Sequence, residues 1–198
     1  MPSSDSLRSR LRVALLPAPP PASEPPDGDG RPAAVLIPLV DGPEPSLVFT
    51  ERAADLPRHA GEMSFPGGLR HEADPDLLHT ALRETEEELG LPPSDVDVLG
   101  ALEPFLTYAT GFWLTPFVGA LSSGQRFAPS PAEIAEVFEV PLARLARVER
   151  EVEYRREGWT WTGFAYEVDG RTIWGATGRI LHRFLEVIRK EMTWPTVS

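Results

Sequence analysis

Residues 33–40 (AAVLIPLV) are nearly all apolar, and this run limits the possible folds more than any other part of the sequence. A second strand-like segment, residues 46–52 (SLVFTER), follows across the turn Asp41-Gly42-Pro43. A strand that is apolar on both faces has to be covered on both faces. We therefore expect residues 33–40 to lie inside a sheet that other elements cover on either side.

The remaining segments supply both strands and helices for such an arrangement. Glycine turns, at Thr110-Gly111 and Asp169-Gly170, separate pairs of further strands. The expected strands are residues 96–105, 112–121, 136–141, 159–168 and 171–175, and the expected helices are residues 4–16, 75–89 and 177–192, with a short helix between 141 and 148. Strands and helices mix without a strict βαβ rhythm. This order predicts an α/β fold in which a mixed sheet is sandwiched between helices.

The N-terminal part differs in composition from the rest. Residues 17–32 (PAPPPASEPPDGDGRP) are rich in proline and glycine, which is typical of a linker or an extended arm rather than a core. We therefore expect an N-terminal helix and arm over residues 1–32, followed by one catalytic domain over residues 33–198.

Composition excludes several classes of function. The chain has no cysteine, so thiolate metal sites and cysteine nucleophiles are excluded. A net charge of −11 argues against nucleic acid as the main partner. The apolar runs are shorter than the roughly 20 residues that span a bilayer, and the N-terminus lacks a signal-peptide pattern. We expect a cytoplasmic protein that does not bind membranes.

The helix at residues 76–89 carries the residues best suited to chemistry. Helical geometry places its leucines on one face and Glu84, Glu87 and Glu88 on the neighbouring face. Three converging carboxylates suit hard cations such as Mg²⁺ or Mn²⁺. The alternative is a solvated acidic face, which is what most charge clusters are. Gly90 is expected to end the helix as a C-cap.

The segment Arg83–Leu91 (RETEEELGL) resembles the second half of the Nudix box, with Gly68 as the opening glycine of the box. Two features depart from the usual pattern. Thr85 stands at a position that is usually bulky and apolar, and Asp74 replaces the first glutamate of the box, with one extra residue before Arg83. The resemblance implies a metal-dependent pyrophosphohydrolase with a Nudix-type α/β/α fold.

Residues 47–68 (LVFTERAADLPRHAGEMSFPGG) resemble the extended motif of the Nudix branch that hydrolyses coenzyme A. That branch also carries aspartate at the position of Asp74 and the same one-residue expansion. The departures are Ala53 for serine and Pro57-Arg58 for the expected arginine and its neighbour. Residues 131–142 and 173–181 are similar to later segments of the same branch, so the likeness covers roughly residues 33–185.

The resemblance also implies roles for individual residues. The expected metal ligands are Glu84, Glu87, Glu88 and the carbonyl of Gly68. Glu87 or the loop acid Glu133 would accept the proton of the attacking water, and Glu136 is an alternative loop acid. The expected substrate-binding residues are Arg52, Arg58, His59, Phe65, Gly67 and Arg83. Arginine and histidine side chains suit the phosphates of coenzyme A, since a guanidinium binds phosphate oxygens in pairs.

Coenzyme A would give adenosine 3′,5′-bisphosphate and 4′-phosphopantetheine. Another Nudix substrate (ADP-ribose, NADH or a dinucleoside polyphosphate) is one alternative, and a non-catalytic nucleotide sensor is another. The strand-like spacing of Trp159, Trp161 and Trp174 favours positions in the core or at its rim over a role in stacking on a nucleotide base. The sequence does not decide how many metals bind, which residue is the base or which form of coenzyme A is preferred. It also leaves open whether the protein is a homodimer.

Overall fold

A computed structural model describes residues 4–20, 25–26, 30–53, 61–107, 109–156 and 158–191. The helices are α1 (Ser4–Ala14), α2 (Leu77–Leu89), α3 (Leu142–Val148) and α4 (Gly175–Glu191), with a short 3₁₀ helix η2 (Pro93–Asp95). The strands are β1 (Arg31–Val40), β2 (Ser46–Arg52), β3 (Met63–Ser64), β4 (Gly67–Leu69), β5 (Asp97–Ala101), β6 (Phe105–Leu106), β7 (Phe112–Leu121), β8 (Ile134–Pro141), β9 (Glu149–Arg156), β10 (Trp159–Val168) and β11 (Arg171–Ile173).

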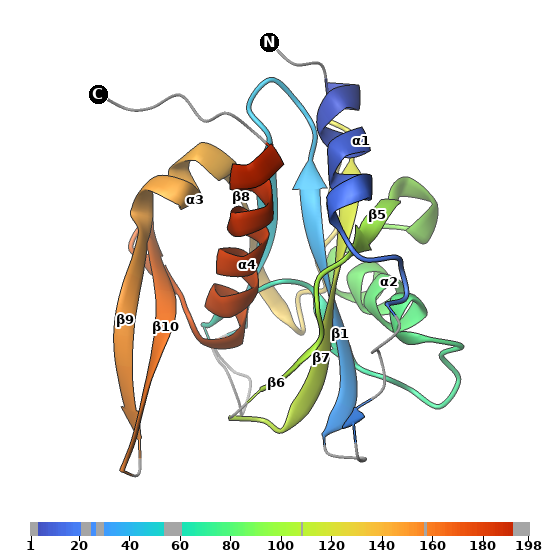
Figure 1. The fold of residues 1–198 in the computed structure, drawn as a ribbon. Coiled ribbons are helices and arrows are strands. Elements are labelled where there is room, and N and C mark those ends of the chain that lie inside the picture. The colour runs from blue at the N-terminus through green and yellow to red at the C-terminus, as the bar shows by residue number, and fades with distance from the viewer. Residues whose placement is uncertain are drawn as a thin grey trace.

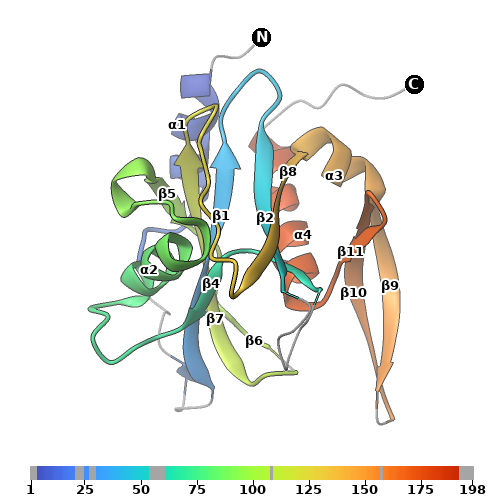
Figure 2. The same cartoon turned by 180° about the vertical axis from the view of Figure 1, so that it is seen from behind.

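The larger sheet is mixed and has β1 at its centre. Its main order is β3-β2-β1-β7-β5, while β4 pairs with β1, β6 with β7 and β8 with β2 (Figures 1 and 2). Strands β1 and β7 run parallel from Arg31↔Phe112 to Val40↔Leu121, and the other pairings are antiparallel. The central position of β1 matches the expectation for a strand that is apolar on both faces.

Helices cover both faces of this sheet. In Figure 1, α1 and α4 lie in front of it, and in Figure 2 the reverse face shows α2. The side chains of β1 divide between the two cores: Ile37 and Leu39 pack on the α1 and α4 side, and Ala34 and Leu36 pack on the α2 side. The predicted mixed sheet between helices is therefore confirmed.

A second, three-stranded sheet (β11-β10-β9) stands beside α4 and was not fully predicted. The hairpin of β10 and β11 was expected, but β9 was not. Its sequence, EREVEYRR, is dominated by charged side chains, and only Val152 and Tyr154 alternate with them as in a strand. The predicted strand 96–105 is in fact two short strands, β5 and β6, separated by Leu102–Pro104.

Helix α1 packs against the body of the protein. Leu7, Leu11 and Leu15 are buried in the same core as α4, as their spacing of four residues favours. Arg8 donates a hydrogen bond of 2.6 Å to Asp41 at the end of β1. Further on, the backbone of Leu16 exchanges two hydrogen bonds with Ala101 of β5.

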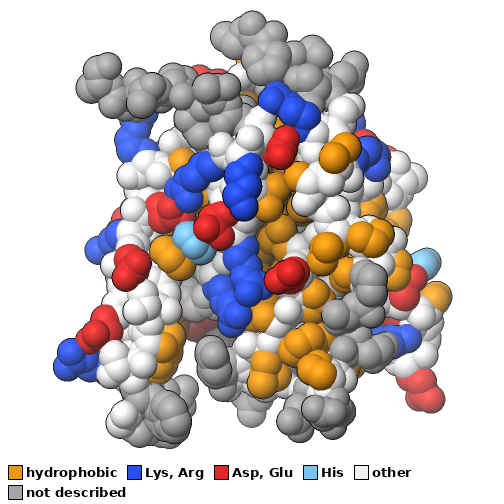
Figure 3. All heavy atoms as spheres, in the orientation of Figure 1, with side chains coloured by type: hydrophobic (Ala, Val, Ile, Leu, Met, Phe, Trp, Pro, Cys, Tyr) orange, Lys and Arg blue, Asp and Glu red, His pale blue; other side chains and the backbone are white. Residues whose placement is uncertain are grey.

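The helices on the two faces of the sheet carry opposite net charge. Helices α1 and α4 hold seven Arg and Lys residues against three Asp and Glu, and Figure 3 shows cationic side chains gathered over this face. Helix α2, on the reverse face, has one Arg and four Glu. An anionic substrate beside α2 would therefore depend on cations supplied by the surrounding loops. Among the described residues, no helix is long and apolar enough to cross a membrane.

Candidate metal and substrate site

Helix α2 begins and ends as predicted. The carboxylate of Asp76 accepts a hydrogen bond of 2.9 Å from the His79 amide, which caps the N-terminus. At the other end Gly90 adopts a left-handed conformation with φ of 62°. Thr85, the unusual residue of the box, is buried and donates its hydroxyl to the Ala81 carbonyl at 2.7 Å. This bond lets a polar residue occupy an apolar position.

Glu88 is the most deeply buried acid of the helix. Only 3% of it is exposed, and its Oε2 atom is buried without a hydrogen-bond partner. Burial, followed by the nearby carboxylate of Glu84, raises the pKa of Glu88 to about 8. Arg52 and the backbone N–H of Gly67 oppose this rise only in part. A buried carboxylate oxygen without a partner is a suitable ligand for a cation.

Glu84 lies directly against the backbone of Gly68. A Cβ atom placed on Gly68 would come within 2.5 Å of the Glu84 carboxylate, so a larger residue here would force the Glu84 side chain to move. Burial raises the pKa of Glu84, and an ion pair of 3.0 Å with Arg83 works against that rise. Of the three acids expected beside Gly68, the structure thus places Glu84 against it.

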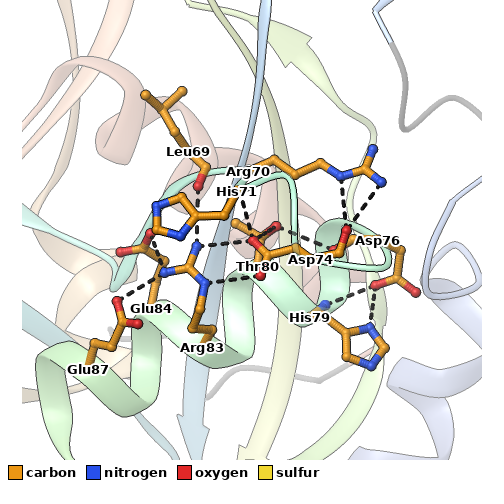
Figure 4. Close-up of polar contacts among 10 residues, drawn as sticks. All are labelled: Leu69, Arg70, His71, Asp74, Asp76, His79, Thr80, Arg83, Glu84 and Glu87. Carbon is orange, nitrogen blue, oxygen red and sulfur yellow. Dashed lines mark hydrogen bonds and ion pairs between the residues drawn. The ribbon is translucent and has the colours of Figure 1, made fainter.

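Glu87, by contrast, is turned towards solvent. Its side chain is 54% exposed and accepts a hydrogen bond of 2.9 Å from Arg83 (Figure 4). Within the described part of the chain, no group of three or more His, Asp and Glu side chains is arranged as a metal site. Glu84 and Glu88 interact with each other, but the three predicted ligands do not form one cluster.

Arg83 binds the loop in front of α2 through Asp74. Its Nε and Nη2 atoms each lie 3.1 Å from a different carboxylate oxygen of Asp74, and Nη2 also donates to the Leu69 carbonyl (Figure 4). Thr80 donates a further bond of 2.9 Å to Asp74. These contacts, with the Arg83 bond first, hold the pKa of Asp74 well below its usual range. The guanidinium predicted to bind substrate thus makes its contacts within the protein.

Arg52, at the end of β2, reaches the same site from the sheet. Its Nη1 atom lies 3.9 Å from Oε1 of Glu88, and its Nε atom is buried without a partner. Glu133 is exposed, and its charge contributes to the raised pKa of Glu88, so it too lies nearby. Arg58 and His59 fall outside the described residues.

Other predicted residues have structural contacts. Phe65 is 3% exposed and stacks on Phe49 with ring centroids 4.7 Å apart, which places it in the core. A Cβ atom on Gly67 would lie 2.3 Å from the Ala34 carbonyl, so Gly67 is required for close packing on β1. Glu136 binds Arg171 at 3.0 Å.

The tryptophans lie at the rim of the small sheet, as favoured from the sequence. Trp161 and Trp174 are 38% and 45% exposed, and both contact the ring of Tyr154. The side chain of Trp159 is outside the described part.

The donors present fit a hard divalent cation. Glu88 offers an unpartnered buried oxygen, Glu84 offers a second carboxylate, and the close approach of Gly68 places backbone beside it. Arg52 adds a positive charge that could bind a phosphate oxygen. The arrangement brings together groups whose chemistry suits a divalent cation and a phosphate.

Comparison with known proteins identifies the class. A model of the NUDIX domain family matches residues 30–162. The protein named Uncharacterized Nudix hydrolase NudL from Pectobacterium atrosepticum is 40% identical over 161 residues, which cover 77% of this chain and 80% of that protein. The protein of the same name from Photorhabdus laumondii is 38% identical over 183 residues, which cover 91% of this chain and 95% of that protein.

Solved structures show the same fold. The crystal structure of the Nudix hydrolase RenU from M. smegmatis superposes with a TM-score of 0.57 over 84% of this chain and 89% of that chain, at 17% identity. The chain belongs to the Nudix hydrolase superfamily. It is therefore an enzyme that hydrolyses a nucleoside diphosphate derivative, and hydrolases of this family generally need divalent cations such as Mg²⁺ or Mn²⁺.

Proposed function

We propose that this Nudix hydrolase cleaves the pyrophosphate bond of coenzyme A or its derivatives, giving adenosine 3′,5′-bisphosphate and 4′-phosphopantetheine. The observation that carries the proposal is the position of Arg52. This residue belongs to the 47–68 segment that resembles the coenzyme A branch, and its guanidinium lies beside the buried acid Glu88. The segment thus contributes directly to the surroundings of the candidate metal site.

Glu84 and Glu88 would hold Mg²⁺ or Mn²⁺ together with the carbonyl of Gly68, and Glu87 would join them on leaving Arg83. The bound cation supplies charge neutralisation and an activated water. Arg52 would bind an oxygen of the pyrophosphate, because a guanidinium matches phosphate geometry. Glu133 or Glu87 would accept the proton of the attacking water, in keeping with their exposure to solvent.

The coenzyme A 3′-phosphate gives the proposal a specific prediction. Arg58 and His59 follow Arg52 in the same segment and would bind this group. An enzyme adapted to coenzyme A should therefore discriminate against dephospho-coenzyme A, which lacks it. ADP-ribose, NADH and dinucleoside polyphosphates share the pyrophosphate but not the pantetheine arm.

The test is a substrate panel with Mg²⁺ and with Mn²⁺, in which products are identified by mass. The panel contains coenzyme A in free, oxidised and acyl forms, dephospho-coenzyme A, ADP-ribose, NADH and a dinucleoside polyphosphate. The proposal expects the highest kcat/KM for a coenzyme A form, and ¹⁸O-water identifies the attacked phosphorus. A higher kcat/KM for ADP-ribose or NADH would replace coenzyme A, and binding without product release would indicate a nucleotide sensor.

A pair of variants separates loss of a phosphate contact from a general effect of charge. Arg52→Gln should lower kcat/KM for coenzyme A by roughly a hundredfold, since a charged hydrogen bond to a phosphate oxygen contributes a few kcal/mol. Arg155→Gln is the matched control. Its side chain is 78% exposed on β9 and pairs only with the nearby Glu153 among the contacts found. Equal activities of the two variants would contradict the role of Arg52.

A further inference from the structure

Two like charges face each other where β2 and β8 approach the site. Glu51 of β2 is the direct cross-strand partner of Glu136 of β8 in an antiparallel pair. Carboxylates in directly opposed positions repel each other and destabilise the pairing of their strands. The end of this strand pair therefore needs a compensating cation.

Arg171 of β11 supplies that cation. Its Nε atom donates to Glu51 at 2.8 Å, and its Nη2 atom donates to Glu136 at 3.0 Å. The guanidinium carbon also lies 3.9 Å from the centroid of the Phe138 ring, which supports it from β8. One arginine of the small sheet thus binds both carboxylates of the larger sheet.

The same strand ends position two residues of the candidate site. The register of β2 and β8 shifts between Glu51 and Arg52, so that Arg52 pairs with Ile134 across a bulge. One residue later the Ala53 amide donates a hydrogen bond of 2.9 Å to the carbonyl of Glu133. Arg52 and Glu133 are the residues that approach Glu88 from this side.

We propose that Arg171 is a positioning residue for the hydrolytic site, which holds the ends of β2 and β8 together by neutralising the opposed pair Glu51 and Glu136. The proposal rests on the proposed function in placing Arg52 and Glu133 at the site. Arg171 does not touch the reacting atoms. It acts through the bulge and through the hydrogen bond between Ala53 and Glu133.

The test uses hydrogen exchange of the Ala53 amide, which reports directly on opening of the strand ends and needs no substrate. In Arg171→Gln this amide should exchange about tenfold faster than in the wild type, because local opening becomes easier. The double variant Arg171→Gln/Glu136→Gln removes one of the opposed charges and should restore slow exchange. Arg144→Gln is the matched control, since Arg144 also makes two bonds to a carboxylate, but to that of Asp169 rather than to Glu51 or Glu136.

Activity supplies the second measurement, on whichever nucleotide substrate the enzyme turns over fastest. Arg171→Gln should lower kcat about tenfold or more, because small displacements of site residues have large effects on rate. The double variant should recover most of this loss, and Arg144→Gln should match the wild type. If the enzyme does not hydrolyse coenzyme A, these comparisons among the variants can still be made with another nucleotide substrate.

Two results would overturn the proposal. One is wild-type exchange at Ala53 in Arg171→Gln. The other is a double variant that stays as impaired as the single one, which would mean that Arg171 acts on substrate or elsewhere. Should Arg171→Gln fail to fold, Arg171→Lys takes its place, since a single ammonium cannot bind both carboxylates in the same fork. Unchanged exchange in that variant would equally contradict the proposal.

Discussion

The guanidinium of Arg52 and the carboxylate of Glu88 lie 3.9 Å apart, and each has a buried polar atom without a hydrogen-bond partner. Buried polar atoms are nearly always hydrogen-bonded, so such exceptions call for an explanation. A cation bound by Glu88 and a phosphate bound by Arg52 would satisfy both atoms at once. The pair thus relates the acid of helix α2 to the arginine of strand β2.

Glu88→Gln should reduce kcat by roughly a hundredfold or more while leaving the fold intact, because the variant loses a metal ligand but keeps the side-chain volume. The free energy of unfolding should not fall, since a neutral amide replaces a carboxyl whose ionised form is costly in this buried position. Steady-state kinetics and urea unfolding measure the two effects. Near-normal turnover would rule out Glu88 as a ligand.

Metal binding near neutral pH should release a proton. The pKa of Glu88 is raised from 4.5 to about 8, so at pH 7 the metal-free protein holds this carboxyl mostly protonated. A cation displaces the proton, and about one proton should leave per cation bound. Calorimetry of Mn²⁺ binding in two buffers of different ionisation enthalpy measures the number of protons released. Equal heats in both buffers would contradict the prediction, and Glu88→Gln should show no buffer dependence.

The same shift makes the metal-free protein sensitive to alkali. Because the folded pKa of Glu88 exceeds its ordinary value, its contribution to stability is complete below pH 4.5 and is lost as pH rises towards 8. The free energy of unfolding should therefore decline over this range in the wild type more steeply than in Glu88→Gln. Urea unfolding in the presence of a chelator at several pH values gives the comparison.

Gly68→Ala should impair metal binding more than folding. Its new methyl group would lie 2.5 Å from the Glu84 carboxylate and displace that side chain. We expect the dissociation constant for Mn²⁺ to rise about tenfold or more, as is typical when a ligand loses its orientation. Gly42→Ala is the control, because nothing lies within 4 Å of its added Cβ. Similar Mn²⁺ affinities for the two variants would exclude a special role for Gly68.

Asp74→Asn should destabilise the protein by about 2 to 3 kcal/mol at pH 7, since it breaks the paired bonds from Arg83. The pKa of Asp74 is lowered in the folded state, so its contribution is present above pH 3.8 and is lost as pH falls further. The difference in unfolding free energy between variant and wild type should therefore shrink in acid. Asp95→Asn, at an exposed position, should stay within about 0.5 kcal/mol of the wild type.

Leu11→Ala tests whether helix α1 folds with the catalytic domain or as a separate arm. Leu11 is fully buried in the core shared with α4, so its truncation should cost about 2 to 4 kcal/mol if the two unfold together. Val13→Ala, which changes a side chain that is 87% exposed on the same helix, should have almost no effect. Urea unfolding, followed by tryptophan fluorescence, measures the free energy of unfolding of both variants. An unchanged value for Leu11→Ala would indicate that α1 is an independent arm.

Local patterns made the helix α2 predictable. Its apolar spacing and the glycine at position 90 both act within a few residues, and both were found as expected. The central strand β1 was equally predictable, because it is buried on both faces and is therefore almost entirely apolar. The place of Gly68 in the motif likewise predicted that it lies near Glu84.

Contacts between separate segments could not be predicted, because no local sequence pattern indicates them. Arg83 binds Asp74 nine residues earlier, in an irregular loop, and Arg171 binds Glu51 across 120 residues. The mutual orientation of the acids of α2 also depends on such partners, because Arg83 pairs with both Glu84 and Glu87 on the exposed side of the helix, whereas Glu88 is buried. Strand β9 was not predicted because six of its eight residues are charged, and Val152 and Tyr154 alone are too few to indicate a strand.

Strand β5 forms an edge of the larger sheet, and the segment after α1 lies along it. The two backbone bonds between Leu16 and Ala101 occupy groups that an open edge would offer to another molecule. Gly100 permits this approach, since a Cβ there would lie 2.6 Å from the Leu16 carbonyl. The segment after α1 thereby occupies backbone groups at one end of this edge that would otherwise be open to a strand of a neighbouring molecule.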